Sequence, residues 1–436
     1  MSSSHSLTVR HPDTILRGRA IHAGSLFTIV LVFLFAANVY DPGGALGLKY
    51  VAIFLLCVSA IRTLKYFELS SLEVIGGMLL FVVWPCWALL FGAVRKGDML
   101  VGASQVTPFL FGLVLAAVLC AFDTRIPLRL FYACLFSLAI VVLTSFALVY
   151  LLPDNPFSSA LFAVLTSLHE KEGYFGMQSS GGVEVPIIYF GSTLFLVPTF
   201  VYYLFVGRML RAGIVFLAIE VTFSKAGIII ALVFSALYSV SVLFGRSSPA
   251  VREGIRAPVG RRLRKFLPIV IIVAVASALL PFIPALSDEM RDSLAGESDT
   301  ILVRIGHFQS VMNLFRQHPS YLIVGQGVGV PFYSLGESTY VQSFEIDHLN
   351  TIRKFGLLWF IGFSAVVFYS AYKLIRKGRI EERAFGCALI SIYFAAGTNP
   401  LLISPLFIIV MMLSYFAQKG QLESPCECPA SDLQRV

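Results

Sequence analysis

The chain has 436 residues, of which 57% are hydrophobic and 13% charged, and its formal net charge is +8. Soluble domains are about 45–50% apolar and about 25% charged, so this composition excludes an ordinary soluble globular protein. With its repeated apolar runs of about 20 residues, it indicates a polytopic membrane protein without a separate soluble domain. The basic excess implies no nucleic-acid partner, because basic residues gather at the edges of apolar runs, next to lipid headgroups.

About twelve apolar segments are expected to form helices, because backbone groups cannot stay unpaired in lipid. These segments are 24–40, 45–61, 72–93, 99–121, 127–152, 185–206, 210–223, 226–245, 266–286, 352–374, 384–398 and 401–417. The seventh and eighth segments are close-set, as are the last two, and each pair fits either one broken helix or two helices. The sequence therefore predicts an all-α polytopic membrane protein, with residues 1–436 forming a single integral membrane domain.

The distribution of lysine and arginine predicts that both termini lie in the cytoplasm. In this orientation the basic loop 246–265 and the tail 418–436 are cytoplasmic. The first apolar run lacks a small-residue cleavage pattern, so it is interpreted as a first helix and not as a removed signal peptide. Cys426 and Cys428 lie in the polar tail, which offers too few further ligands for a metal site.

Two long segments fall on the outer, periplasmic side in this orientation, at about 153–184 and at 287–351. Loops of this length are usually functional or disordered. Within the second loop, apolar residues recur at helical spacing at Ile301, Ile305, Phe308, Met312 and Phe315, and the opposite stripe carries Arg304, His307, Ser310 and Gln317. This pattern predicts an amphipathic helix that lies on the outer leaflet.

His348 is the leading catalytic candidate. It follows Glu345 and Asp347, just before an apolar run. Glu345 shares a face with His348 if this turn is already helical. A neighbouring carboxylate would raise the pKa of the imidazole and select its tautomer, which suits a general base. The alternative is a solvated histidine at a helix start with no chemical role.

Several cations lie near helix ends on the outer side, namely Lys225, Arg304, Arg353 and Lys354. Such a cation either binds an anionic group of a substrate or extends toward lipid headgroups. Glu220 is an ionisable residue in the outer half of a predicted span. A charged carboxylate is energetically costly at that depth unless another group pairs with it. It either forms a structural ion pair with Lys225, or it positions that lysine or an acceptor sugar.

The turn Gly325-Gln326-Gly327-Val328-Gly329 is not a nucleotide-binding loop, because no Lys-Ser/Thr pair follows it. A tight turn is expected here, and amides exposed around Gly327 would admit a diphosphate. The sequence contains no Asp-x-Asp, no His-x-x-x-His and no cysteine pair with a nearby histidine. Neither a metal nor another cofactor is therefore expected.

Several of these features together resemble the O-antigen polymerase and O-antigen ligase superfamily, over roughly residues 185–400. They are Thr222-Phe223-Ser224-Lys225-Ala226-Gly227 at the start of a span, Arg304 in the amphipathic helix, His318-Pro319 before the glycine turn, and Asp347-His348-Leu349-Asn350 before a helix containing Gly356. The late outer loop and the span count also look like that family. In two departures, Lys225 stands where the family often has arginine, and Leu349 interrupts the usual His-Asn step.

The resemblance implies a GT-C-like, metal-independent, inverting glycosyltransferase of the bacterial inner membrane. Its donor would be a glycan on a polyprenyl diphosphate in the bilayer, and flippase and chain-length regulator proteins would be its partners. His348 would take a proton from the acceptor hydroxyl. Arg304 and Lys225, with Arg353, would neutralise the departing diphosphate, and the outer loop would cover the sugar.

Three functions stay open. A polymerase would join lipid-linked repeat units into O-antigen, capsular polysaccharide or exopolysaccharide. A ligase would transfer finished glycan to lipid A–core. A transporter, from a different class, would move lipid or polysaccharide without catalysis. Transporters tend to have two related halves, whereas the polar residues here gather at one outer face. A polymerase is therefore the expectation.

Overall fold

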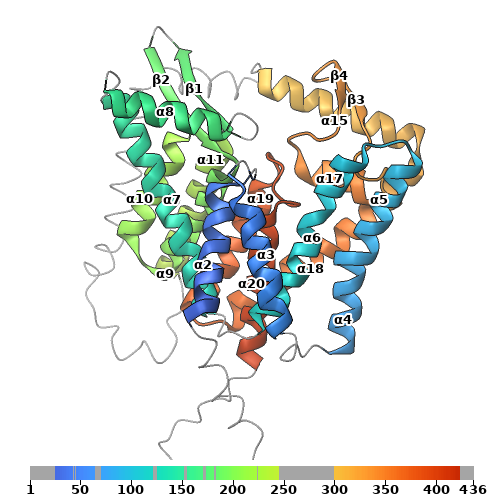
Figure 1. Cartoon of the computed structure of the whole chain (residues 1–436), viewed down its shortest axis with the longest axis horizontal. Helices are drawn as coiled ribbons and strands as arrows, with labels where there is room; N and C mark the ends of the chain where they lie inside the picture. Colours follow the sequence, from blue (N-terminus) through green and yellow to red (C-terminus); the bar gives the residue numbers. More distant parts are fainter. Residues whose placement is uncertain are drawn as a thin grey trace, which may run out of the picture.

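The computed structural model describes residues 25–42, 44, 46–63, 70–120, 125–151, 155–169, 173–180, 183–222, 224–244 and 299–422. This part of the chain is a bundle of helices with two small β hairpins at one end (Figure 1). We call that end the hairpin end; α2 begins and α20 ends at the opposite end. The predicted span 266–286, the loop 246–265, residues 287–298 of the outer loop and residues 423–436 of the tail lie outside the described residues.

The first helices follow the first five predicted apolar segments. They are α2 (Ser25–Tyr40), α3 (Leu48–Thr63), α4 (Ser71–Met78), α5 (Trp84–Val94), α6 (Met99–Leu119) and α7 (Arg125–Leu151). A π-helical turn, η2 (Leu79–Val83), joins α4 to α5. Such turns are rare within α-helices, and here the indole Nε1 of Trp359 donates a hydrogen bond to the Leu80 carbonyl at 3.0 Å.

The predicted helix at 185–206 is wrong in its first part. After α8 (Pro156–His169), strand β1 (Gly173–Ser180) pairs antiparallel with β2 (Val183–Phe190), and the helical path begins only with η3 (Gly191–Phe195) and α9 (Leu196–Val206). The reason is local: β2 is rich in β-branched and aromatic residues, which favour strands. It also contains Pro186, which disrupts a helix interior.

The segments 210–223 and 226–245 form two helices, α10 (Met209–Val221) and α11 (Lys225–Phe244). The Phe200 and Phe216 rings meet at 5.5 Å near the middle of α9 and α10, which are antiparallel after a left-handed turn at Gly207. Phe205 and Tyr238 meet at 5.3 Å, so the C-terminal parts of α9 and α11 lie together. Helices α10 and α11 therefore run in opposite directions.

The last two segments are also separate helices, α19 (Ile380–Ala395) and α20 (Pro405–Leu422), which follow α18 (Leu357–Lys377). Ser364 and Tyr393 share a hydrogen bond at 2.6 Å, so the end of α19 lies beside the first part of α18. Phe363 and Phe407 approach to 6.0 Å, which places the start of α20 at the same level. The turn between α19 and α20 therefore lies at the hairpin end.

The predicted amphipathic helix exists as α15 (Asp299–Gln317), and part of its polar stripe packs against the protein. His307 and Ser310 are buried, whereas Ile305 and Phe308 are 47% and 50% exposed. The polar stripe is covered because hairpin β3 (Phe332–Ser334) and β4 (Thr339–Val341) packs onto it. This approach needs glycine on both sides: a Cβ atom on Gly306 would lie 2.4 Å from the Gly336 nitrogen.

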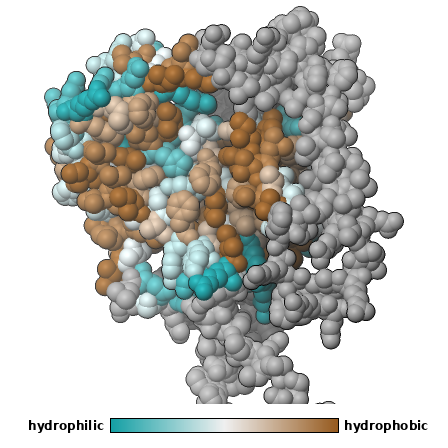
Figure 2. All heavy atoms as spheres, turned by 180° about the vertical axis from the view of Figure 1, so that it is seen from behind, coloured by the Kyte–Doolittle hydropathy of each residue, from teal (hydrophilic) through white to brown (hydrophobic). Residues whose placement is uncertain are grey.

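Four helices in the described ranges are long and apolar enough to cross a membrane, namely Glu73–Val94, Met99–Leu119, Arg125–Val149 and Leu357–Arg376. Shorter apolar helices follow several of the other predicted segments. Figure 2 shows apolar side chains over much of the visible middle of the molecule, with polar ones gathered toward its two ends. The coarse prediction of a helical membrane protein is thus confirmed, and the count of about twelve spans stays a prediction.

Candidate functional site

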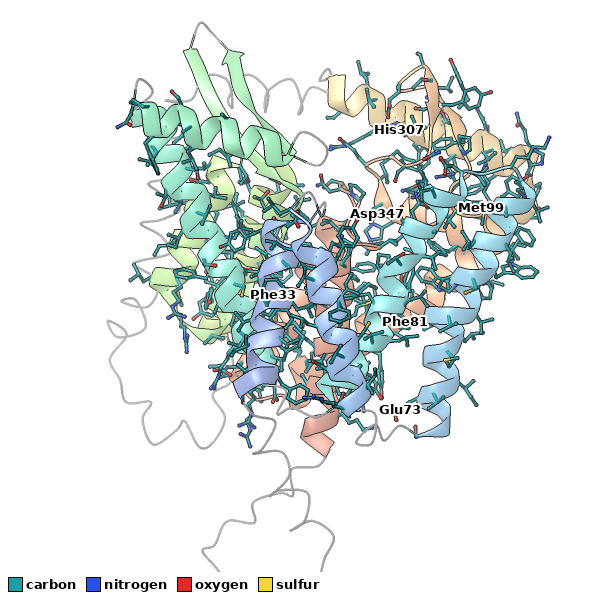
Figure 3. All side chains as sticks on the ribbon, viewed as in Figure 1. Phe33, Glu73, Phe81, Met99, His307 and Asp347 are labelled. Carbon is teal, nitrogen blue, oxygen red and sulfur yellow. The ribbon has the colours of Figure 1, made fainter. Side chains whose placement is uncertain are left out.

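The candidate site is built on a short helix, α17 (Asp347–Phe355), which the predicted span 352–374 did not separate from α18. The chain breaks at Gly356, where φ is +83°, a conformation that favours glycine. A Cβ atom there would lie 2.3 Å from the Ile323 carbonyl oxygen of α16 (Pro319–Val324). Glycine therefore allows α16 and α17 to pack closely, and α17 lies across the hairpin end of the bundle, where Asp347 and His307 are seen in Figure 3.

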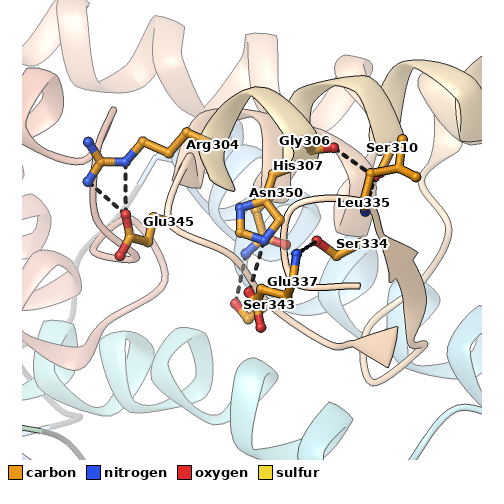
Figure 4. Close-up of polar contacts among 10 residues, drawn as sticks. All are labelled: Arg304, Gly306, His307, Ser310, Ser334, Leu335, Glu337, Ser343, Glu345 and Asn350. Carbon is orange, nitrogen blue, oxygen red and sulfur yellow. Dashed lines mark hydrogen bonds and ion pairs between the residues drawn. The ribbon is translucent and has the colours of Figure 1, made fainter. Parts of the chain in front are cut away.

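Arg304 of α15 and Glu345, just before α17, form an ion pair (Figure 4). Arg304 Nε donates to Glu345 Oε2 at 2.8 Å, and Nη2 lies 2.7 Å from the same oxygen. The two side chains are 33% and 48% exposed, so solvent and ligands can reach the pair. The structure thus holds Arg304 next to the segment that leads into His348.

The predicted pairing of Glu345 with His348 is wrong, because Glu345 is occupied by Arg304. The imidazole of His348 is half-buried, with its ring centroid 4.7 Å from that of Tyr393 and 5.8 Å from that of Phe360. This burial lowers the pKa of His348, and the main chain of Tyr393 acts in the opposite direction. His348 Nε2 is buried and has no hydrogen-bond partner among the described residues. The lowered pKa favours the neutral form of the ring, which is the form that can accept a proton.

Asp347 anchors the first turn of α17. The side chain is 2% exposed, and its Oδ2 accepts a hydrogen bond from the Leu402 amide at 2.5 Å, while Thr351 Oγ1 donates to Oδ1 at 3.5 Å. Burial raises the pKa of Asp347 to about 6, against the Leu402 amide and the charge of Lys354, which lower it. Because Leu402 belongs to the turn between α19 and α20, this bond fixes the start of α17 relative to Tyr393.

The prediction that Arg353 binds substrate is not supported by its surroundings, because its side chain is fully buried (0% exposed) and engaged by the protein. Its guanidinium donates four hydrogen bonds, to Gln326 Oε1 (2.7 Å), the Val330 carbonyl (3.1 Å), the Gln342 carbonyl (2.8 Å) and Asn350 Oδ1 (3.0 Å). It also lies 4.5 Å above the Phe332 ring. Arg353 therefore clamps the base of hairpin β3–β4.

Lys354 is also buried, at 3% exposed, and does not extend to headgroups. Its Nζ donates to Ser343 Oγ at 3.2 Å. Burial lowers the pKa of Lys354 to about 7; the neighbouring charge of Arg353 adds to this shift, and that of Asp347 opposes it. Together these contacts make α17 a helix whose inner face holds charged groups in fixed positions.

The glycine turn does not expose amides for a diphosphate, so the role predicted for Gly327 is wrong. The Gln326 and Gly327 amides donate to the carbonyls of Arg353 (2.6 Å) and Lys354 (3.1 Å), and the Val328 amide donates to a carbonyl of α5 at 3.1 Å. Gly327 has a φ of +97°, and a Cβ atom there would lie 2.5 Å from the Gly92 nitrogen. The turn is instead a junction at which α5, α6 and α17 meet without side chains between them.

The predicted pair Glu220 and Lys225 lies at the turn between α10 and α11, at the hairpin end. Glu220 is half-buried, and Lys225 is the first residue of α11. Helix α11 packs against α9 and α19, whereas α17 packs against α16 and α18. Helix α19 packs against α11 and also carries Tyr393 against the ring of His348, so it contacts both groups.

Two residues that line this region were not among the predicted site residues. His307 is 1% exposed, and its Nε2 lies 2.9 Å from Glu337 Oε1 (Figure 4). Gly397 faces the His348 ring: a Cβ atom on it would lie 3.6 Å from Nδ1. The small and polar break at residues 396–400, between two apolar segments, was the available signal for a turn at the site. Within the described ranges, no three His, Cys, Asp or Glu residues gather in a way that could hold a metal ion.

Comparison of the chain with protein-family models and with curated proteins finds no match. A functional assignment therefore depends on the chemistry that Arg304, Glu345 and His348 can perform at the hairpin end of the bundle.

Proposed function

We propose that this protein is a membrane glycosyltransferase of the O-antigen polymerase and O-antigen ligase superfamily. It would polymerise polyprenyl-diphosphate-linked repeat units into O-antigen, capsular polysaccharide or exopolysaccharide at the periplasmic face of the bacterial inner membrane. One observation carries the proposal. An accessible guanidinium, Arg304, is tied through Glu345 to the short segment that ends in His348, a half-buried imidazole whose Nε2 is buried without a hydrogen-bond partner among the described residues.

The proposed reaction is a single displacement. An acceptor hydroxyl attacks the anomeric carbon of the donor glycan, its proton passes to the imidazole of His348, and the bond from that carbon to the diphosphate oxygen breaks. The electron pair of this bond leaves with the polyprenyl diphosphate, and the configuration at the carbon inverts. The lowered pKa of His348 supports its role, because an imidazole must be neutral to accept a proton.

Arg304 supports departure of the diphosphate. A guanidinium presents parallel N–H groups that match phosphate oxygens and keeps its charge at any physiological pH. Charge placed where negative charge develops stabilises the transition state. In the structure Glu345 occupies this guanidinium. Lys225 stays a second candidate for the diphosphate, whereas Arg353 and Gly327 act through the shape of the site and not by contact with substrate.

The test uses the full-length protein in lipid nanodiscs with a lipid-diphosphate repeat unit as donor and acceptor. Wild type should yield longer glycans, and His348→Ala should lose about 10²–10⁴-fold in turnover, as expected for removal of a general base. Arg304→Ala should lose at least as much. Arg316→Ala, at an exposed position of the same helix, is the matched control and should elongate normally.

The proposal fails if His348→Ala elongates as fast as wild type. A product found only on added lipid A–core would favour the ligase. Movement of the glycan-lipid across the bilayer without any new glycosidic bond would favour the transporter.

A further inference from the structure

Hairpin β3–β4 presents two tyrosines on its outer face. Tyr333 and Tyr340 are cross-strand partners, with ring centroids 5.5 Å apart and planes at 72°. They are 48% and 72% exposed in the part of the chain that the structure describes. Phe332 and Ser334 alternate with Tyr333 and are buried against α15, as the two-residue period of a strand requires. The hairpin therefore has one buried face and one face that displays aromatic rings.

This hairpin is held rigidly. Arg353 donates to the carbonyls of Val330 and Gln342, one on each side of its base. At its tip the Leu335 amide donates to Ser310 Oγ of α15 at 2.8 Å. A two-stranded hairpin alone is only marginally stable in water, so these contacts keep the tyrosine pair in one position. A preorganised surface loses little entropy when it binds a ligand.

The hairpin is also connected to the candidate site. Both lie at the hairpin end, and the hairpin projects beyond the ends of α5 and α6 (Figure 1). His307, whose Nε2 lies 2.9 Å from Glu337 Oε1 between the two strands, is one helical turn from Arg304 on α15 (Figure 4). The tyrosine pair and the Arg304–Glu345 pair therefore lie at the same end of the molecule, on elements that contact each other.

The chemistry of the face favours a sugar. Aromatic rings that stay exposed leave apolar surface in contact with water, which is unfavourable. A cluster of exposed rings therefore indicates a surface that binds a ligand or partner. The flanking residues Glu337, Ser338 and Thr339 are exposed and offer carboxylate and hydroxyl groups. A pyranose presents an apolar C–H face that packs on a flat ring, and hydroxyl groups that bond to such neighbours.

We propose that Tyr333 and Tyr340 form a glycan-binding platform that holds the saccharide chain of the lipid-linked substrate while its reducing end is at the site of Arg304 and His348. This inference rests on the proposed function, because it assumes that the substrate is a glycan. The platform acts on affinity and not on the chemical step, since neither ring contacts the candidate catalytic groups.

The test measures binding of the free repeat-unit oligosaccharide, released from its lipid, to the full-length protein in nanodiscs by titration calorimetry. The double variant Tyr333→Thr/Tyr340→Thr removes both rings and keeps strand-forming residues. We expect its affinity to fall roughly tenfold or more, as for loss of a paired aromatic contact. The double variant Tyr333→Phe/Tyr340→Phe keeps the rings and should bind within about threefold of wild type. Tyr369→Ala, which removes an exposed tyrosine of α18, should bind like wild type.

The platform is overturned if wild type and the threonine double variant bind the oligosaccharide equally. Thermal unfolding must show that both proteins are folded. Quenching of a Tyr340→Trp variant by brominated lipids, beyond the quenching of wild type, would instead place this face in the bilayer and also overturn it. The calorimetric result needs no turnover. If glycan binding depends on the two rings but no elongation occurs, the platform stands and the polymerase function is rejected. If the threonine variant elongates glycans with unchanged KM and unchanged affinity, the polymerase function stands and the platform is rejected.

Discussion

Arg304 Nη2 lies 2.7 Å from Glu345 Oε2, and this contact joins residues 41 positions apart in the chain. Both side chains are partly exposed, so the ion pair contributes only about 0–1 kcal/mol to stability. A weak and accessible pair is easily exchanged. If the proposed function holds, the phosphate of the substrate replaces the carboxylate of Glu345 on the guanidinium without disturbing the fold.

Glu345→Gln should tighten binding of inorganic pyrophosphate as a competitive inhibitor of elongation. The amide competes less for Arg304 than the carboxylate does, and loss of a competitor worth up to about 1 kcal/mol corresponds to a gain of up to about fivefold. The measurement is the inhibition constant at fixed salt. Glu337→Gln, which changes an exposed carboxylate paired with His307, is the control. Weaker pyrophosphate binding in Glu345→Gln would show that Glu345 is not a competitor.

The rate of elongation should depend on pH through His348. Burial lowers the pKa of this imidazole, so at a given pH a smaller fraction of it is protonated than of a solvated histidine. Because the protonated ring cannot accept the acceptor's proton, kcat/KM should rise with pH through a pKa below 6.5 and be level near neutrality. A pH–rate profile of wild type tests this, with exposed His318→Asn as the control. An acidic limb centred above 6.5 would contradict it.

Arg353→Met should destabilise the fold by about 3–5 kcal/mol, because it removes a buried charge whose four hydrogen bonds satisfy buried partners. Thermal or denaturant unfolding in detergent measures this loss. Arg316→Met, at an exposed position, should change stability by less than about 0.5 kcal/mol. If Arg353→Met lost turnover while its unfolding stayed the same, Arg353 would instead be a substrate-binding cation.

Gly327→Ala should cost at least about 2 kcal/mol, because alanine is strained at a φ of +97° and its Cβ atom would meet the Gly92 backbone at 2.5 Å. The matched change is Gly76→Ala in helix α4, where a Cβ atom meets nothing within 4 Å. That substitution should be neutral or stabilise by up to about 1 kcal/mol through helix propensity. Unfolding midpoints of the two variants compare them directly. Equal midpoints would show that the glycine turn tolerates a side chain.

The sequence alone predicted most of the apolar helices among the described residues. Long apolar runs mark helices because their signal is local: length and hydrophobicity suffice when backbone groups must pair within the segment. The same reasoning predicted α15 and the position of His348 at the start of a helix. Local signals also existed for β2, where Pro186 and β-branched residues outweigh a continuous apolar run.

The tertiary structure alone decided which partner each charged group finds and which face of α15 is buried. A helical period shows two stripes but not which of them meets a neighbour, and here close contact of Gly306 with Gly336 brought the hairpin onto the polar stripe. Glu345 lies near His348 in sequence, yet it bonds Arg304 from a distant helix. Ion pairs and buried hydrogen bonds depend on distances in space between segments far apart in the chain, and a linear pattern does not contain those distances.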